Sequence, residues 1–111
     1  MALSCVFCDI GRQPPGPNIL HQDDVAFVVQ DINPKAPVHL LVIPYKHITS
    51  MVETDESTIG HLILIAEKIA KEEGIGTHGY RLVVNQGQAA RQEIAHLHVH
   101  LLGGRQLGAM G

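Results

Sequence analysis

The sequence lacks the features of several broad classes of protein. None of its apolar runs reaches the roughly 18 residues that a membrane-spanning helix needs. It has no excess of positive charge, since the formal net charge of the 111 residues is −3, which argues against a nucleic-acid-binding surface. The first five residues form neither a basic nor an apolar segment, so we expect no signal peptide and a cytoplasmic location. Repeats and linkers are also lacking, so we expect a single domain over residues 1–111.

Cysteine is scarce, because the chain contains only Cys5 and Cys8. In a reducing compartment their spacing indicates a metal or redox site rather than a structural disulfide. Nothing that resembles a βαβ unit surrounds the pair, which argues against a thioredoxin-like redox motif. By spacing alone the pair is half of a zinc site.

Histidine is abundant, with eight residues in the chain and three of them within residues 96–100. There it alternates with Leu97, Val99 and Leu101, which predicts a strand with one apolar face and one histidine face. A helix would scatter the three rings at steps of about 200°. Successive rings on a strand face lie roughly 6.5–7 Å apart, which is awkward for three ligands on one ion. The strand therefore predicts divided roles, and a three-histidine metal site or a solvated histidine-rich strand is the alternative.

The remaining patterns predict more strands and one long helix. Apolar or alternating runs predict strands over 19–22, 25–30, 38–43 and 80–85, and the third is a central strand covered on both faces. His39 is the one polar residue in that central strand, and the nearby histidine strand favours a functional role for it. The helix is expected to begin at Thr54 or Asp55 and to end before Gly74, with an apolar stripe of period 3.6 and with His61 on the surface. These elements indicate an antiparallel α+β domain.

The histidine strand and the following Gly103-Gly104-Arg105 closely resemble the signature of the histidine-triad (HIT) nucleotide-binding family. The resemblance covers nearly the whole chain and includes residues 31–34, 36–39, 43–48 and 84–85. The ending Gly103-Gly104-Arg105-Gln106 is similar to that of the Hint branch, the purine nucleoside phosphoramidases. This resemblance implies an antiparallel sheet with one long helix and a short N-terminal helix. It also implies a homodimer that uses the long helix and the strand at 80–85.

The resemblance implies cleavage of the P–N bond of nucleoside 5′-phosphoramidates of the AMP-amine or AMP-lysine type. By family likeness His98 is the nucleophile that forms a nucleotidyl-histidine, His100 contacts phosphate oxygens and His39 orients the site. Asp31 would accept from both ribose hydroxyls, and capping of a turn is its alternative role. The other implied substrate-binding residues are Asn85 at the phosphate, Glu93 at a position that contacts the leaving group, Ile94 after it, and Phe7, Ile10, Val29, Ile32 and Leu41 around the base.

The resemblance also implies a structural zinc ion. Bacterial-type members with Cys-x-x-Cys near the N-terminus carry such an ion, and Cys5, Cys8, His47 and His96 match its ligands. Two thiolates and two imidazoles make a closed tetrahedral site with no position for substrate, and reduced free cysteines are the alternative. Clustered carboxylates suited to magnesium are lacking, so we expect no catalytic metal.

The chain departs from the family pattern at three places. Glu93 stands where animal relatives often have serine, and a carboxylate there is expected to favour basic amine leaving groups. Arg91 stands where small residues are common, and residues 107–111 lack the Trp-Pro-Pro-Gly ending of those relatives.

Two other functions remain open. One is a dinucleoside polyphosphate hydrolase or nucleotidyl transferase of the same family, which the Gly-Gly-Arg-Gln ending disfavours. The other is a zinc-stabilised nucleotide-binding or partner-binding module without significant turnover, which the complete set of histidines disfavours.

Overall fold

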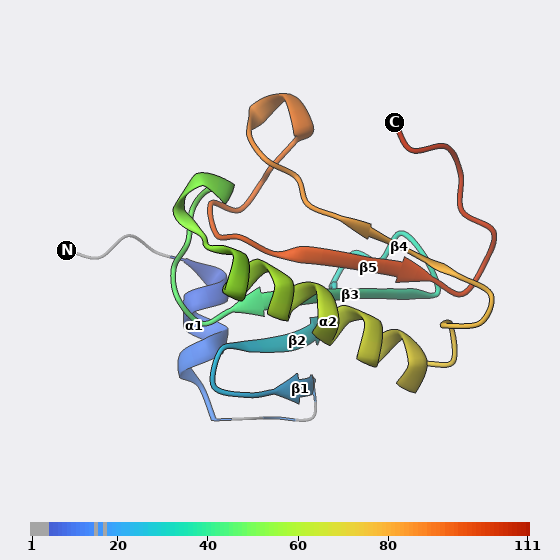
Figure 1. Cartoon of the computed structure of the whole chain (residues 1–111), viewed down its shortest axis with the longest axis horizontal. Helices are drawn as coiled ribbons and strands as arrows, with labels where there is room; N and C mark the ends of the chain where they lie inside the picture. Colours follow the sequence, from blue (N-terminus) through green and yellow to red (C-terminus); the bar gives the residue numbers. More distant parts are fainter. Residues whose placement is uncertain (1–4, 15, 17) are drawn as a thin grey trace.

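The computed structural model describes residues 5–14, 16 and 18–111 and contains an antiparallel sheet of five strands with a helix on each face (Figure 1). In chain order the elements are α1 (Val6–Arg12), β1 (Ile19–Gln22), β2 (Ala26–Gln30), β3 (Val38–Pro44), a 3₁₀ turn (Met51–Glu53), α2 (Glu56–Glu72), β4 (Tyr80–Val83), a second 3₁₀ turn (Gln88–Ala90) and β5 (Val99–Gly103). The strand order across the sheet is β1-β2-β3-β5-β4. The expected α+β fold, with one long and one short helix, is confirmed.

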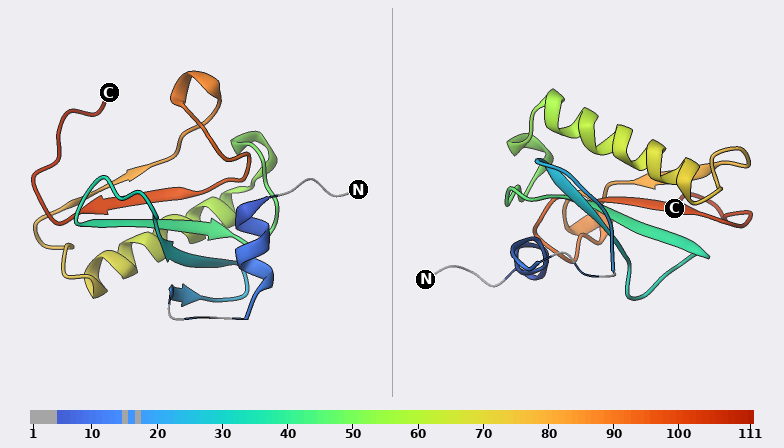
Figure 2. Two further views of the ribbon diagram at one scale, coloured as in Figure 1. Left: turned by 180° about the vertical axis from the view of Figure 1, so that it is seen from behind. Right: turned by 90° about the horizontal axis from the view of Figure 1, so that it is seen from below.

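The central strand β3 is buried on both faces, as predicted. Leu40 and Val42 belong to the core beneath α2, whereas Leu41 and Ile43 belong to a smaller core that contains Phe7 of α1. The right-hand view of Figure 2 shows α2 on one side of the sheet and α1 on the other. By the same alternation the histidine of β3 belongs on the α1 side.

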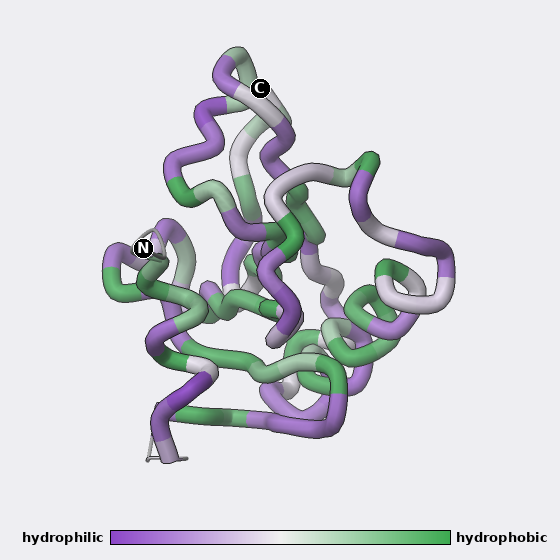
Figure 3. Tube along the Cα trace, turned by 90° about the vertical axis from the view of Figure 1, so that its left-hand side faces the viewer, coloured by the Kyte–Doolittle hydropathy of each residue, from purple (hydrophilic) through white to green (hydrophobic). Residues whose placement is uncertain are grey.

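The long helix α2 is a core-packing element. Its N-cap is Asp55, whose carboxylate accepts a hydrogen bond from the Thr58 amide at 2.7 Å, so the expected start is confirmed. Its buried residues are Leu62, Ile65, Ala66, Ile69 and Ala70. The colours of α2 therefore alternate between green and purple as the helix turns (Figure 3). Among the described residues, no helix is long and apolar enough to cross a membrane.

Four strand boundaries differ from the prediction, one of them because β3 extends to Pro44 rather than ending at residue 43. β2 begins at Ala26 because the Val25 amide donates to Asp23 Oδ1 at 2.8 Å in the preceding turn, and β4 ends at Val83 rather than at residue 85. The histidine strand begins only at Val99, which pairs with Val42 at the end of the β3–β5 ladder. Residues 96–98 are instead held by a hydrogen bond from the Leu97 amide to the Ile48 carbonyl at 2.6 Å.

The expectation that His61 is simply a surface residue was incomplete. Its Nε2 lies 2.8 Å from Asp23 Oδ2, and Nε2 of His21 lies 3.1 Å from the same oxygen. Burial alone would raise the pKa of Asp23, but hydrogen bonds from two backbone amides and the two imidazoles hold it well below its usual range. This carboxylate joins the β1–β2 turn to α2 on the side of the sheet opposite α1.

Candidate active site and metal centre

Four metal-ligating side chains converge at the start of α1. Cys5 is the N-cap of this helix and Cys8 lies in its first turn, while His47 follows β3 and His96 precedes β5. All four donor atoms lie within 4.8 Å of one another. The sulfur–nitrogen distances include 3.4 Å from Cys5 to His96 and 3.2 Å from Cys8 to His47. Zinc bonds of about 2.3 Å to sulfur and 2.0–2.1 Å to nitrogen, in a tetrahedron, give a sulfur–nitrogen separation of about 3.5 Å, so the four residues fit this ion.

The buried ring of His96 is oriented for metal binding. Its Nε2–H donates to the Pro44 carbonyl at 2.8 Å, which leaves the Nδ1 lone pair facing the two cysteines and His47. Burial, helped by the neighbouring His47, lowers the pKa of His96. The ring is therefore held in the neutral form that binds metal.

The next histidine along the chain, His98, has the opposite orientation. Its Nδ1–H donates to the His96 carbonyl at 2.7 Å, so a neutral ring keeps its lone pair on Nε2. The ring is only 8% exposed and packs edge-to-face on Phe7, with 5.0 Å between ring centroids. A hydrogen bond and edge-to-face contacts with the rings of Phe7 and His100 therefore hold Nε2 of His98 in a defined position.

The other two histidines form a directed chain of hydrogen bonds. The backbone amide of Lys35 donates to Nδ1 of His39 at 3.0 Å, which places the ring proton of His39 on Nε2. That nitrogen lies 2.9 Å from Nδ1 of His100 and 3.3 Å from Oδ2 of Asp31. Once His100 accepts at Nδ1, its own proton is on Nε2. Each neutral ring thus has one assigned tautomer.

Both histidines of this chain are held neutral. Burial, supported by the neighbouring His98 and His39, lowers the pKa of His100 to about 4, although Asp31 acts in the opposite direction. Burial also lowers the pKa of His39. Near pH 7, His100 therefore presents an uncharged N–H donor at Nε2. The amide nitrogen of Asn85 lies 3.4 Å from that atom, so two donors stand side by side where an anionic oxygen can accept from both.

Asp31 has the turn role that was considered as its alternative. Its Oδ1 accepts from the Asn33 amide at 2.8 Å, and its Oδ2 faces His39. Each carboxylate oxygen has a second lone pair, so this anchoring still permits bonds to a ligand. Asp31, His39 and His100 also have donor atoms within 4.8 Å of one another. A metal there would compete with the proton on Nε2 of His39, so the geometry favours a proton-bearing site over a metal site.

A cavity of about 840 Å³ lies over these groups. Its walls come from α1, β2, β3, the loop before β5 and the C-terminal segment. Every residue predicted for catalysis or substrate binding lines it. These residues are Phe7, Ile10, Val29, Asp31, Ile32, His39, Leu41, Asn85, Glu93, Ile94, His98 and His100. Phe7, Val29 and Leu41 are buried in its wall, whereas Ile32 is 92% exposed and stands at the rim.

The paired glycines after β5 bring the chain back to this cavity. Gly104 has φ +93°, and a Cβ there would lie 3.0 Å from Cβ of Pro37, so this position requires glycine. The following Arg105 donates to the Lys35 carbonyl at 2.8 Å. The Gly-Gly-Arg segment thereby holds the loop whose amide begins the chain of hydrogen bonds to His100.

The family assignment follows from comparison with known proteins. Residues 15–107 match the HIT domain. This chain belongs to the HIT family. The purine nucleoside phosphoramidase of Escherichia coli strain K12 is 42% identical to it over 99% of this chain and 95% of the relative.

Solved structures of HIT proteins share the fold. The HIT family hydrolase from Clostridium thermocellum has a TM-score of 0.87 at 42% identity and covers 99% of this chain and 98% of its own. The zinc-bound histidine triad family protein from Mycobacterium smegmatis has a TM-score of 0.81 at 30% identity and covers 92% of this chain and 76% of its own.

Part of the cavity lining of this HIT protein could not be predicted from its sequence. Lys35, Arg81, Leu107 and Met110 also line it, and none of them stands in a recognisable motif. Main-chain donors such as the Lys35 amide have no sequence signal at all.

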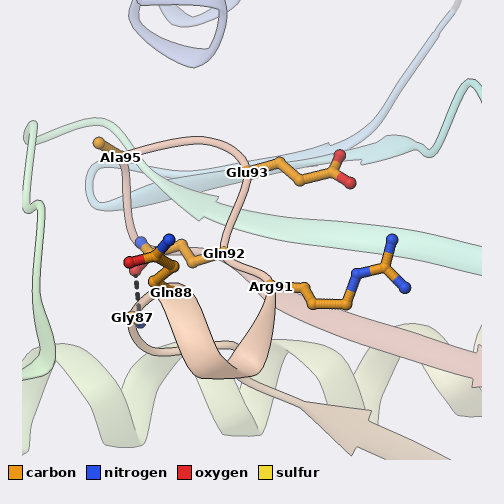
Figure 4. Close-up of a pocket in the computed structure, with 6 residues that line it drawn as sticks. All are labelled: Gly87, Gln88, Arg91, Gln92, Glu93 and Ala95. Carbon is orange, nitrogen blue, oxygen red and sulfur yellow. Dashed lines mark hydrogen bonds between the residues drawn. The ribbon is translucent and has the colours of Figure 1, made fainter.

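A second hollow of about 410 Å³ adjoins the main cavity. It lies in the loop between β4 and β5 and is lined by Gly87, Gln88, Arg91, Gln92, Glu93 and Ala95 (Figure 4). Arg91 and Glu93 line both spaces, so this loop forms a shared wall.

Proposed function

We propose that this protein hydrolyses the P–N bond of purine nucleoside 5′-phosphoramidates of the AMP-amine and AMP-lysine type, through a covalent nucleotidyl-His98 intermediate. The observation that carries the proposal is the orientation of His98. Its Nδ1–H is bound to the His96 carbonyl, so its nucleophilic Nε2 is free in a cavity that also presents His100 and Asn85. The purine nucleoside phosphoramidase of E. coli, 42% identical over nearly the whole chain, supports the same activity.

The reaction proceeds in two displacements at phosphorus. Nε2 of His98 attacks the α-phosphorus, a phosphorus–nitrogen bond forms to the imidazole, and the bond to the amine breaks as the amine takes up a proton from solvent. Water then attacks the same phosphorus, gives up a proton to solvent, and releases the nucleoside monophosphate and neutral His98. Splitting one displacement into two lowers the barrier of each. Donors at His100 and Asn85 bind the equatorial oxygens as charge develops, which is commonly worth about 2.7–4 kcal/mol for one lost donor.

We place the nucleoside in the same cavity. The buried apolar side chains of Phe7, Val29 and Leu41 would contact the base, and Ile32 at the rim would cover it. Asp31 would accept from the ribose hydroxyls with the lone pairs that its turn leaves free.

We further propose one structural zinc ion on Cys5, Cys8, His47 and His96. When bound, it would link α1 to the segment that follows β3 and to the segment that precedes β5. The donor geometry and the zinc-bound relative from M. smegmatis support this assignment. Its four protein ligands leave no open position, so its role would be structural.

A homodimer through α2 and β4 and a cytoplasmic location are also part of the proposal. β4 is an edge strand of the sheet, and a second copy could cover its unpaired backbone groups.

Turnover by His98→Ala tests the proposal. Adenosine 5′-phosphoramidate, AMP-lysine and diadenosine polyphosphate are offered to the wild type, to His98→Ala and to the matched control His78→Ala, whose ring is exposed. Loss of the nucleophile should lower phosphoramidate turnover by at least about a thousandfold, while the control keeps wild-type rates. A preference for the polyphosphate would favour the hydrolase or transferase alternative. Nucleotide binding without turnover would favour the binding-module alternative.

A further inference from the structure

The loop between β4 and β5 is held in one conformation. The side chain of Gln92 accepts from the Gly87 amide at 2.8 Å and donates to the Ile94 carbonyl at 3.2 Å, and Gln86 accepts from the Met51 amide at 2.8 Å. Arg91 has φ 61°, the only non-glycine residue with positive φ in the described part of the chain. Such a conformation costs free energy and persists only where the surroundings enforce it. The loop therefore presents its side chains in a preorganised arrangement.

Two opposite charges project from this loop on the side away from its anchor. Arg91 and Glu93 flank Gln92 and extend together, whereas Gln88 and Gln92 extend the other way (Figure 4). Both are exposed and line the main cavity. Within the residues described, neither forms a hydrogen bond or an ion pair through its side chain, with the other or with a third group. The two charges are therefore available to a ligand.

The other charged side chains of the cavity are already engaged. Asp31 binds the Asn33 amide, Lys35 donates to the Asn33 carbonyl, Arg81 donates to the Gly108 carbonyl, and Arg105 donates to the Lys35 carbonyl. This contrast singles out Arg91 and Glu93 among the ionic groups of the cavity.

Both ends of the loop adjoin the phosphate end of the cavity. It spans residues 86–95, so it begins directly after Asn85, whose amide lies 3.4 Å from His100, and it ends three residues before His98. Because Arg91 and Glu93 also line the main cavity, a ligand bound at its phosphate end has this loop beside it. The hollow behind Arg91 and Glu93 offers about 410 Å³ beyond the main cavity for part of this ligand.

We propose that Arg91 and Glu93 form a leaving-group subsite that selects amines with a zwitterionic far end, of the amino-acid type. Glu93 binds the ammonium of this end and Arg91 binds its carboxylate. The inference rests on the proposed phosphoramidase function and adds the part of the substrate that the nucleotide does not supply. Both assigned contacts are with the far end of the leaving group, so their effect is on the choice of substrate.

Four AMP derivatives of matched length test this subsite. AMP is joined through nitrogen to hexylamine, to 1,6-diaminohexane, to 6-aminohexanoate and to the side-chain amine of lysine, which gives neutral, cationic, anionic and zwitterionic far ends. Each kcat/KM is divided by that for hexylamine on the same preparation, so a general loss of activity cancels.

The two variants should affect substrates of opposite charge. Glu93→Gln should lower the ratio for the cationic substrate by up to about fivefold, the upper end of the range for exposed ion pairs, and Arg91→Gln should do the same for the anionic one. Both should lower the ratio for lysine. All these differences should shrink at high salt because exposed charges are screened. Glu72→Gln and Lys68→Gln, which change exposed charges on α2, should leave the ratios unchanged.

Ratios that do not change in either loop variant would overturn the subsite while the proposed function stands. A change in only the anionic ratio would also overturn it, because the zwitterionic class requires Glu93. If the wild type cleaved none of the four compounds, the proposed function would fail. Calorimetric binding of the lysine and hexylamine compounds to the same variants would then decide the subsite by the same ratios.

Discussion

Removal of metal from the cluster of Cys5, Cys8, His47 and His96 should lower the stability of the fold. It should also loosen the contacts that hold the ring of His98, the proposed nucleophile. The cluster fastens α1, a helix of seven residues, which is too short to be stable by itself. Zinc held at 1,000 times its dissociation constant contributes about 4.1 kcal/mol to stability. For 111 residues an unfolding entropy of about 2.1 cal/mol/K per residue gives about 0.23 kcal/mol/K. The melting temperature should therefore fall by about 18 °C.

The same change should reach His98 through α1. Phe7 lies between the two cysteines, is 4% exposed and packs on the His98 ring, while the metal ligand His96 provides the carbonyl that fixes the tautomer of this ring. Loss of the cross-link should therefore loosen both contacts. The ¹⁵N signals of His98 should change from those of a single Nδ1–H tautomer to those of a mixture.

Calorimetry and ¹⁵N NMR, with and without a chelator and with elemental analysis, provide the measurement. Cys8→Ser is the genetic counterpart of chelation, and added zinc should restore the chelated wild type but not this variant. A shift below about 4 °C, worth about 1 kcal/mol, after verified loss of one ion per chain would refute the reasoning. An unchanged His98 signal accompanied by a large thermal shift would refute the coupling between the two sites.

Three further predictions concern acid stability, ribose binding and the turn after β5. Folding lowers the pKa of His100 to about 4, so the unfolded chain takes up its proton first as the pH falls. Stability should therefore be complete above about pH 6.5 and fall as the pH drops toward 4. Urea titrations should show a smaller decline for His100→Asn. Asp31→Asn keeps the turn acceptor but loses the charge, so AMP affinity should fall by about 1.5–3 kcal/mol and 2′-deoxy-AMP affinity by less; calorimetry measures both. Gly104→Ala should destabilise by about 1–2 kcal/mol, whereas Gly60→Ala, in open space within α2, should stabilise by about 0.5–1 kcal/mol in thermal melts.

The sequence predicted which side chains share a face better than where strands begin. The two-residue period placed Leu97, Val99 and Leu101 in the core beneath α2, and this is confirmed. It also extended the strand back to His96, which is wrong. Leu97 lies in the core, but its amide donates to the Ile48 carbonyl instead of to β3, and a pattern of side chains carries no information on that exchange of partners.

The candidate site shows the same division. Its side chains could be named because a short set of histidines, an aspartate and an asparagine carries the chemistry. The tautomers could not, since they depend on backbone groups of Lys35 and His96 that any residue type would provide. The conformation of the loop at 86–95 was likewise beyond pattern reasoning, because Gln92 anchors it and a positive φ at Arg91 shapes it.

The backbone origin of one donor has a consequence for variation. A main-chain amide sets the direction of the hydrogen bonds from residue 35 through His39 to His100, so the side chain at residue 35 is free to vary. Proline is the exception, because it alone lacks the amide proton. A proline there would leave both rings free to adopt either tautomer, and part of the His100 population would then direct a lone pair, instead of a proton, into the cavity.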